Sequence, residues 1–361
     1  MFERKGSISI PLVGKILHSA HLLTLLAGTT LGILLEKPAT VLAGQGNDKT
    51  QVSTFNPDGQ CMFDDNFRFI AIARPDIIGR CLGNPYPDPD NSGNIIQQTT
   101  KGMLSTYGDM PYFLNGNATY LVMEKRIYER ENQGICPGEM GAQVSTLCRE
   151  VPLVVKHIYT QENAVALTAD DGASRQAIKA MAEAIITTNN KATFFINGMH
   201  YQSFRDLIEE LDQTGSIYFG NHTFGHADLK KLADAGAWSK VNQEIAMGDP
   251  RLYIPDLKHF SPSFRFPGFS DTPELRRLVV SEYGLTVYGA DQGNLDYTVS
   301  PQSAVDRKIS EAQAGQIAYF HFLQRNIATF KSVLERLNER GIRAMDVDSM
   351  LDQSLTRSIF Q

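Results

Sequence analysis

The stretch that decides the fold is Val165–Ser174, VALTADDGAS, in which an apolar run ends on two adjacent carboxylates. A strand often ends in an aspartate that caps the next helix while a glycine makes the turn, and this accounts for one of the two. Asp170 and Asp171 repel each other, and burying a carboxylate without a partner is costly. The second aspartate therefore needs a cation or a proton, which other parts of the chain must supply.

From about residue 152, apolar runs alternate with amphipathic segments of helix length. Repeated strand-then-helix units imply a parallel sheet, and about six such units in succession favour a barrel over an open sheet. The expected fold class of residues 152–361 is therefore α/β, with active residues at the carboxyl ends of the strands. Within it, residues 227–247, ADLKKLADAGAWSKVNQEIAM, are predicted to be helical.

The first 43 residues have the layout of a secretory signal peptide. Arg4, Lys5 and Lys15 precede an apolar stretch, and Ala43 ends a small-residue cleavage pattern. The alternative is a retained anchor, since residues 16–35 are just long enough to span about 30 Å of hydrocarbon. We therefore expect an exported protein, periplasmic, in the cell envelope or secreted, that contacts a membrane only if the leader is retained.

Bulk composition excludes some classes of function. The chain has 361 residues, is 42% hydrophobic and carries a formal net charge of -6, which is ordinary for a soluble globular protein. Nucleic-acid binding usually needs a basic stripe, so we expect no nucleic-acid partner.

Residues 44–60 are polar and are predicted to be a linker, and residues 61–150 contain all the cysteines: Cys61, Cys81, Cys136 and Cys148. An even number in an exported chain suggests two disulfides, with three connectivities open, and free thiols are the alternative. Short strand-like runs and no strong helical period predict a small, disulfide-braced, β-rich domain of unknown role.

The next strand end with ionisable groups is NHTFGH, which contains His222 and His226. Two imidazoles at this spacing can meet one metal ion, although an isolated pair is as often a helix cap or a packed pair. One carboxylate and two imidazoles leave an open position for water, as in catalytic zinc sites. The paired aspartates make the metal interpretation the stronger one.

Later strand ends carry Arg265, Asp291, Asp296 and His321. Taken alone, Arg265 would be a surface ion pair and His321 a hydrogen-bonded core histidine. Each gains weight only from its position at the same end of the predicted barrel.

Taken in order, TADDG, HTFGH, RFPG, DQGNLDY and FHF resemble the motifs of the polysaccharide deacetylase family, the NodB-homology domain of carbohydrate esterase family four. The resemblance covers residues 152–350. It implies a distorted, incomplete (β/α) barrel and a hydrolase that removes acetyl groups from N-acetylated sugars. It also implies a divalent metal, zinc in the first place, with cobalt or nickel as alternatives.

The resemblance also implies a role for individual residues. Asp170 is similar to the catalytic base of the family, and Asp171, His222 and His226 are similar to its metal ligands. The remaining residues that match the motifs are Arg265, which orients the base; His321, the general acid; Asp296 or Asp291, which pairs with that histidine; and the substrate-contacting Pro267, Gly268 and Tyr297.

The chain departs from the family pattern at four positions. Ala169 stands where the family usually has Phe, and Gly268 where many members have Tyr. Tyr297 replaces a common Trp, and Phe322 follows His321 where many members have Asp. Because the base and the three ligands remain, we expect activity to be retuned and not lost.

The function expected is therefore metal-dependent N-deacetylation of an extracellular or cell-wall polysaccharide. Peptidoglycan, a chitin-like oligomer and an exopolysaccharide all fit as substrate. One alternative is an O-acetyl esterase acting on xylan or an exopolysaccharide. Another is a glycan-binding module with a degenerate catalytic site, because a fold can outlive its chemistry.

Overall fold

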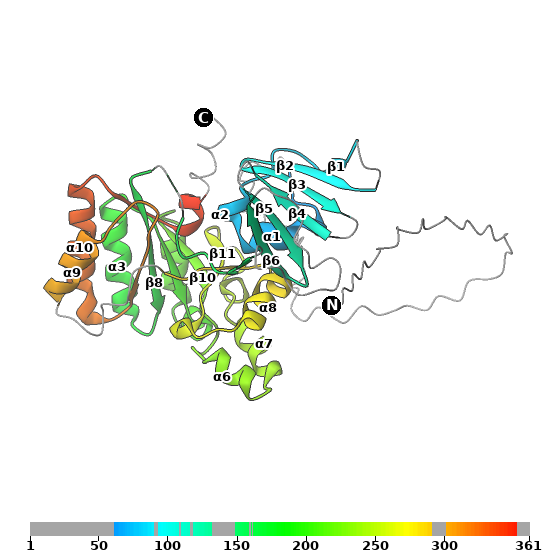
Figure 1. Cartoon of the computed structure of the whole chain (residues 1–361). Coiled ribbons are helices and arrows are strands. Elements are labelled where there is room, and N and C mark those ends of the chain that lie inside the picture. The colour runs from blue at the N-terminus through cyan, green and yellow to red at the C-terminus, as the bar shows by residue number, and fades with distance from the viewer. Residues whose placement is uncertain are drawn as a thin grey trace, which may run out of the picture. The chain divides into compact units, whose positions relative to one another are not determined.

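The computed structural model describes residues 61–89, 93–107, 110–115, 118–131, 149–158, 160, 162–290 and 301–351. The predicted signal peptide and linker lie outside these residues. The described chain forms two sheets, an antiparallel one that ends at Val151 and a parallel one that begins at Ala164 (Figure 1). In the described residues, no helix is both long enough and apolar enough to cross a membrane.

The first sheet is an antiparallel meander in which each strand pairs with the next along the chain. Its strands are β1 (Tyr86–Pro87), β2 (Ile95–Thr99), β3 (Gly102–Tyr107), β4 (Met110–Leu114), β5 (Ala118–Met123), β6 (Arg126–Glu131) and β7 (Arg149–Val151). One face of this sheet, with Leu104, Phe113 and Ile127, is packed in the same apolar cluster as helix α1 (Asp65–Ala73). The predicted β-rich region is confirmed.

Helix α1 was not expected, because the sequence shows no strong helical period between residues 61 and 150. Asp64 caps the helix by accepting a hydrogen bond from the backbone N–H of Asn66. The helix has only nine residues, DNFRFIAIA, and Phe67 and Ile70 to Ala73 are all buried. A helix that is apolar on nearly every side and shorter than the usual search window leaves no periodic signal. A short second helix, α2 (Pro75–Ile78), follows directly.

A disulfide joins Cys61 to Cys81 across a sequence separation of 20 residues, and α1 lies inside the loop that it closes. One of the two expected disulfides is thus present, and Cys136 and Cys148 lie outside the described residues. We expect the Cys61→Ser, Cys81→Ser double variant to lose about 2–4 kcal/mol of unfolding free energy, because the open loop gains entropy in the unfolded state. Urea unfolding of the oxidised protein and the variant measures this, and equal midpoints would contradict it.

The second sheet is parallel, and its strands follow the order β12-β11-β10-β9-β8-β13. Its strands are β8 (Ala164–Asp171), β9 (Ala192–Ile196), β10 (Ile217–Asn221), β11 (Phe260–Phe264), β12 (Thr286–Val287), β13 (Ile317–His321) and β14 (Arg343–Met345). Strand β14 pairs with the first half of β8, whereas β9 pairs with the second half.

No strand pairing joins β12 to β13 among the described residues, so the sheet does not close on itself. Val155 instead bridges to Tyr288 after β12, and His157 bridges to Gln316 before β13. A short extended segment therefore lies where a closed barrel would have paired strands. The expected distorted, incomplete (β/α) barrel is confirmed.

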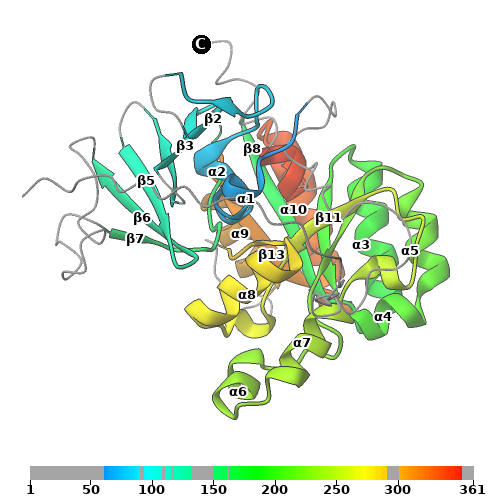
Figure 2. The same cartoon turned by 90° about the vertical axis from the view of Figure 1, so that its right-hand side faces the viewer.

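The helices between these strands are α3 (Arg175–Thr187), α4 (Gly198–Ser203), α5 (Arg205–Asp212), α6 (Leu229–Asp234), α7 (Trp238–Ala246), α8 (Pro273–Tyr283), α9 (Pro301–Ser310) and α10 (Ile327–Glu339). Three single turns, η3 (Pro250–Leu252), η4 (Pro267–Phe269) and η5 (Gln324–Asn326), are 3₁₀-helical. Helices α3, α9 and α10 stand together beside β8 in Figure 1, and α4 and α5 lie near α3 in Figure 2.

The helix predicted over residues 227–247 is broken into α6 and α7. Gly236 lies between them with a φ of 72°, in the left-handed region that glycine adopts without a steric penalty. The single continuous helix was therefore a wrong prediction.

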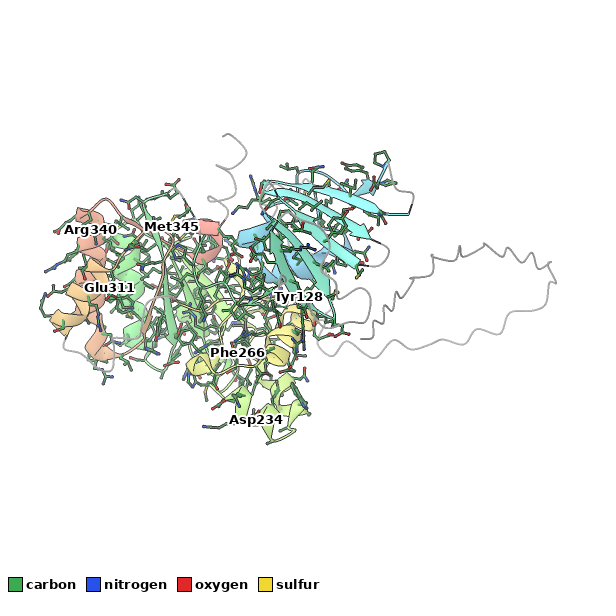
Figure 3. All side chains as sticks on the ribbon, in the orientation of Figure 1. Tyr128, Asp234, Phe266, Glu311, Arg340 and Met345 are labelled. Carbon is green, nitrogen blue, oxygen red and sulfur yellow. A yellow bond between two sulfur atoms is a disulfide. The ribbon has the colours of Figure 1, made fainter. Side chains whose placement is uncertain are left out.

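Two large apolar clusters stabilise the parallel sheet, together with a smaller third cluster that contains Ala166, Phe195 and Ile317. One lies against α3, α5 and α10 and contains Phe194, Phe320 and Phe330. The other contains residues of α1 and β3–β6 together with residues of β11, α8 and the segment after β11, where Phe266 is labelled in Figure 3. The hydroxyl of Thr286 on β12 also donates a 3.0 Å hydrogen bond to the carbonyl of Ile72 on α1. The two sheets thus share a core across the expected boundary near residue 151.

Candidate active site

Several of the predicted site residues lie at or just after the carboxyl ends of parallel strands. Asp171 is the last residue of β8, His321 is the last residue of β13, and His222 follows β10 directly. Carboxyl ends of parallel strands share one edge of a sheet, so the fold brings these groups together. Neither aspartate caps α3, because Ser174 does so by accepting a hydrogen bond from the N–H of Ala177. Helix capping therefore explains neither carboxylate.

Asp171, His222 and His226 form a compact group. Oδ1 of Asp171 lies 3.1 Å from Nε2 of His226 and 3.4 Å from Nε2 of His222. One ligand atom of each residue lies within 4.8 Å of the other two. His222 is buried, Asp171 is partly buried and 47% of the His226 side chain is exposed, so the group is open to solvent on one side.

The tautomer of His222 follows from its second ring nitrogen. Nδ1 lies 2.8 Å from the carbonyl oxygen of Arg265, which can only accept a hydrogen bond, so Nδ1 carries the proton. In a neutral His222, Nε2 then presents a lone pair toward Asp171. A backbone carbonyl that fixes the far nitrogen in this way is a common arrangement for metal-ligating histidine.

The charges of the group favour a bound cation. Burial opposes ionisation of Asp171, but the two adjacent imidazoles outweigh it and hold the pKa of this carboxyl far below its usual value. Contact with Asp171 raises the pKa of His226. Oδ1 of Asp171 is nevertheless buried without a hydrogen-bond donor. A carboxylate oxygen and two imidazole nitrogens that converge in this way fit a divalent metal ion.

The backbone is unusual in the segments that carry this group. Asp171, Thr223 and His226 have φ values of 81°, 64° and 59°, in the left-handed region that non-glycine residues seldom enter. Residues are held in such conformations only where the surrounding structure determines them, most often at functional sites.

Three residues that the sequence analysis did not single out hold the histidine loop in place. The Asn197 amide donates a 2.7 Å hydrogen bond to the carbonyl of His222, and the side-chain oxygen of Asn221 accepts one of 2.9 Å from the N–H of Thr223. The carboxylate of Glu244 accepts one of 2.8 Å from the N–H of Gly225. Asn197 directly follows β9, and Asn221 is the last residue of β10. Their position at strand ends is the one sequence signal that pointed to them.

Asp170 is paired with a buried arginine. Nη1 of Arg265 donates a 2.8 Å hydrogen bond to Oδ1 of Asp170, and the arginine side chain is 0% exposed. Arg265 also donates to the hydroxyl of Thr168 and to the carbonyls of Tyr288 and Gly289. Four acceptors fix the guanidinium, so the orientation of the Asp170 carboxylate is fixed as well.

Replacing Arg265 by methionine should lower the unfolding free energy by about 3–5 kcal/mol at neutral pH, because the charge of Asp170 stays buried without its partner. The loss should be smaller in the double variant with Asp170→Asn, which removes that charge. Urea unfolding of the four proteins of this cycle measures the coupling, and purely additive losses would contradict the pairing.

His321 is half-buried and lies opposite Asp170 in the register of β13 and β8. Its ring lies 5.7 Å from the ring of Tyr319, and its carbonyl accepts a hydrogen bond from the amide of Asn326. Phe322 packs with its ring edge-on to Phe194 in the apolar cluster beside the helices. The aromatic residue that stands in place of an acid therefore points into the core, and it does not crowd His321.

The remaining predicted residues fall into two groups. Pro267 is buried, and Gly268 is exposed with a φ of 60° and nothing within 4 Å of the place where a Cβ would stand. Asp291, Asp296 and Tyr297 lie outside the described residues. The space that a side chain at position 268 would occupy is therefore open.

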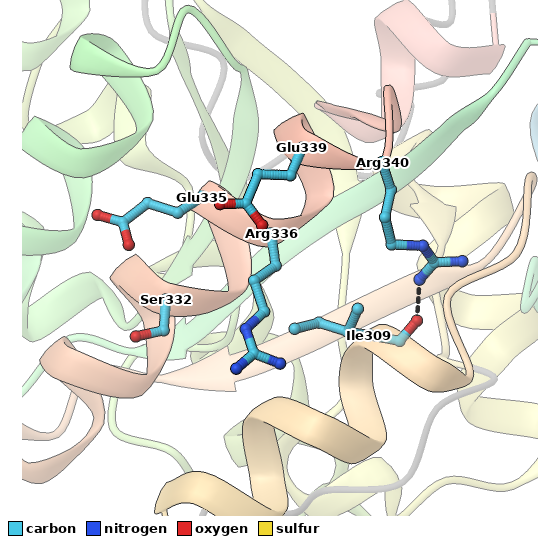
Figure 4. Close-up of a pocket in the computed structure, with 6 residues that line it drawn as sticks. All are labelled: Ile309, Ser332, Glu335, Arg336, Glu339 and Arg340. Atoms are coloured by element: carbon cyan, nitrogen blue, oxygen red, sulfur yellow. Dashed lines mark hydrogen bonds between the residues drawn. The ribbon is translucent and has the colours of Figure 1, made fainter.

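A separate groove of about 610 Å³ lies on α9 and α10 (Figure 4). It is lined by Ile309, Ser332, Glu335, Arg336, Glu339 and Arg340. Ile309 lies near the end of α9, Arg340 directly follows α10, and the others lie on α10, after the chain has left the carboxyl end of β13. The groove is therefore distinct from the site at the strand ends.

Residues 157–288 match the family model described as polysaccharide deacetylase. The chain is 23% identical over 199 residues to a peptidoglycan-N-acetylglucosamine deacetylase of Bacillus cereus, covering 54% of this chain and 70% of that protein. It is 30% identical over 142 residues to a chitin deacetylase of a Pestalotiopsis species, covering 38% of this chain and 45% of that protein. The chain thus spans less than half of the second relative.

One solved structure supports the fold. It is a mutant, with restored activity, of a family-four pseudoenzyme of Bacillus anthracis. Its TM-score to this chain is 0.50 at 17% identity, covering 57% of this chain and 77% of that one. At such low identity the likeness concerns the fold alone.

Proposed function

Because residues 157–288 belong to the polysaccharide deacetylase family of hydrolases, we propose that this protein hydrolyses N-acetyl groups of an extracellular or cell-wall polysaccharide with a divalent metal ion. The observation that carries the proposal is the convergence of Asp171, His222 and His226 beside the buried pair of Asp170 and Arg265. A fold can persist without its chemistry, so these residues support the activity better than the topology does.

Asp171, His222 and His226 would hold the ion, which we propose to be zinc, with cobalt or nickel as alternatives. Three protein ligands with an open side are the usual arrangement of a catalytic zinc site. When bound, such an ion supplies Lewis acidity, which lowers the pKa of water and stabilises negative charge on a carbonyl oxygen.

Asp170 is proposed as the general base that accepts a proton from the attacking water. A general base must be charged and correctly oriented, and the hydrogen bond from Arg265 provides both. Because Arg265 is held by three other acceptors, it keeps the carboxylate in place as the proton arrives.

His321 is proposed as the general acid. The water oxygen bonds to the acetyl carbon, the carbon–nitrogen bond breaks, and the departing amine nitrogen takes a proton from His321 while acetate leaves. His321 and Asp170 are partners in the register of β13 and β8, which supports their action on the same acetamide group. Asp296, or alternatively Asp291, is proposed to pair with His321.

Pro267, Gly268 and Tyr297 are proposed to contact the substrate, with a backbone N–H near Gly268 directed at the developing oxyanion. Donors in that position stabilise the tetrahedral intermediate of acyl transfer. The exposed position of Gly268 supports this role.

The two relatives are named as deacetylases of peptidoglycan and of chitin, which supports an N-acetylated glycan as the substrate here. We propose that the protein is exported, because the leader has the layout of a signal peptide. Peptidoglycan, chitin-like oligomers and N-acetylated exopolysaccharide form the panel to test.

The test is acetate release by the purified protein from these glycans and from acetylxylan, before and after chelation and again after zinc is restored. We expect release from at least one N-acetylated glycan, lost with chelator and recovered with zinc. Faster release from acetylxylan than from chitin oligomers would indicate an O-acetyl esterase. No release from any substrate with metal supplied would refute the hydrolase.

A further inference from the structure

Phe269 presents an aromatic ring to solvent at the edge of the candidate site. It is 39% exposed and follows the exposed Gly268 directly in η4. Its φ is 54°, a conformation that costs a non-glycine residue energy. A residue with a purely structural role would be better served here by glycine, so the ring itself needs an explanation.

The ring lies next to groups that the proposed reaction uses. Its centroid lies 5.1 Å from that of Tyr319, edge to face, and 5.7 Å from the guanidinium carbon of Arg265. The ring of Tyr319 in turn lies 5.7 Å from that of His321. Phe269 is thus linked to the base side of the site through Arg265 and to the acid side through Tyr319.

The loop that carries the ring is also tied to the metal-binding side. The hydroxyl of Ser270 donates a 3.1 Å hydrogen bond to Oδ1 of Asp228, two residues after His226. The N–H of Phe269 donates to the carbonyl of Phe266 at 2.9 Å, which fixes the turn. These two hydrogen bonds hold the backbone that carries the ring, and beside the ring the side-chain space of Gly268 is empty out to 4 Å.

We propose that Phe269 binds a pyranose ring of the polysaccharide by stacking against its apolar C–H face. This inference rests on the proposed function for the identity of the ligand. Sugars have an apolar face and a polar rim, and a rigid, partly exposed aromatic side chain offers a matching surface at little entropic cost. Phe269 is therefore a specificity-determining residue, which favours a sugar polymer over other acetylated molecules.

The matched test compares Phe269→Gly with Leu252→Ala. Glycine suits the positive φ, so the variant should fold with an unlowered thermal midpoint. Leu252 is a similarly exposed apolar residue, 42% exposed, in η3. Its neighbour Arg251 stacks on Phe260, the first residue of β11, which places Leu252 near the opposite edge of the sheet.

We expect Phe269→Gly to raise KM for N-acetylglucosamine tetramer by about tenfold, with kcat changed far less. The fold decrease in kcat/KM should be larger for the tetramer than for 4-nitrophenyl acetate, which carries no sugar. Phe269→Tyr should have the wild-type KM for the tetramer. Leu252→Ala should leave the kinetic constants for both substrates unchanged. An unchanged tetramer KM in Phe269→Gly, or equal losses on both substrates, would overturn the proposal.

A binding measurement separates this inference from the proposed reaction. Calorimetric titration of the tetramer into Asp170→Asn and into Asp170→Asn, Phe269→Gly needs no turnover. Weaker binding by the double variant supports the stacking role, whether or not the wild-type protein releases acetate. Absence of acetate release would refute only the proposed deacetylase activity. Equal affinity of the two variants, or binding by neither, overturns the stacking role.

Discussion

We expect Asp170→Asn to reduce acetate release by about a hundredfold to ten-thousandfold, the range that general base catalysis contributes, without loss of bound zinc. Asparagine has the same shape, and its carbonyl oxygen can still accept the hydrogen bond from Arg265, but it cannot take a proton from water. Initial rates of acetate release at saturating glycan, with zinc content measured on the same samples, provide the test.

Asp212→Asn is the matched control for this variant. Asp212 is also buried, and its carboxylate accepts hydrogen bonds from the backbone N–H groups of Lys258 and His259, next to the first residue of β11. The control should lower stability without lowering the rate per folded molecule. If Asp170→Asn keeps a rate within a few-fold of wild type, the proton acceptor is another group.

We expect Asp171→Ala to have the second large effect, which is the loss of the proposed metal ion and of the activity that depends on it. Oδ1 of Asp171 lies within 3.4 Å of Nε2 of both histidines, and without this proposed ligand two imidazoles remain, one of them nearly half exposed. Changes outside the ligand shell already cost about tenfold to a hundredfold in metal affinity, so loss of a ligand should cost at least about a hundredfold. Zinc titration of the chelated protein measures the affinity.

Thermal unfolding gives a second readout of the same variant. An ion that binds only the folded protein raises the midpoint, so zinc should stabilise the wild type and leave Asp171→Ala unchanged. His200→Ala is the control, because His200 is a half-buried histidine of α4 that does not belong to the ligand group. Equal stabilisation of Asp171→Ala and wild type by zinc would place the ion elsewhere.

The positions of the candidate residues were more predictable from the sequence than their local geometry. The apolar run before Asp170 and the spacing of His222 and His226 were sufficient to place these groups at strand ends. The left-handed backbone of Asp171, Thr223 and His226 was not predictable, because Asp, Thr and His ordinarily avoid it and only the loop contacts impose it.

The environment of Arg265 was also not available from the sequence. Its acceptors Thr168, Tyr288 and Gly289 lie on segments far apart along the chain, so no local pattern shows that the guanidinium is enclosed. Locally, α1 was missed because its apolar residues cover nearly the whole helix. The helical periodicity continued past Gly236, although the backbone turns there and the helix is broken. Periodicity shows which residues face the core and does not show where the backbone turns.

The most direct measurement of the central claim is zinc K-edge X-ray absorption of the loaded protein. We predict one zinc ion per chain with scattering from two imidazoles and from oxygen ligands, at about 2.0–2.2 Å. The imidazole signal should decrease by half in His222→Ala. A spectrum without imidazole scattering, or one that is the same in the wild type and in His222→Ala, would contradict a metal ion held by Asp171, His222 and His226.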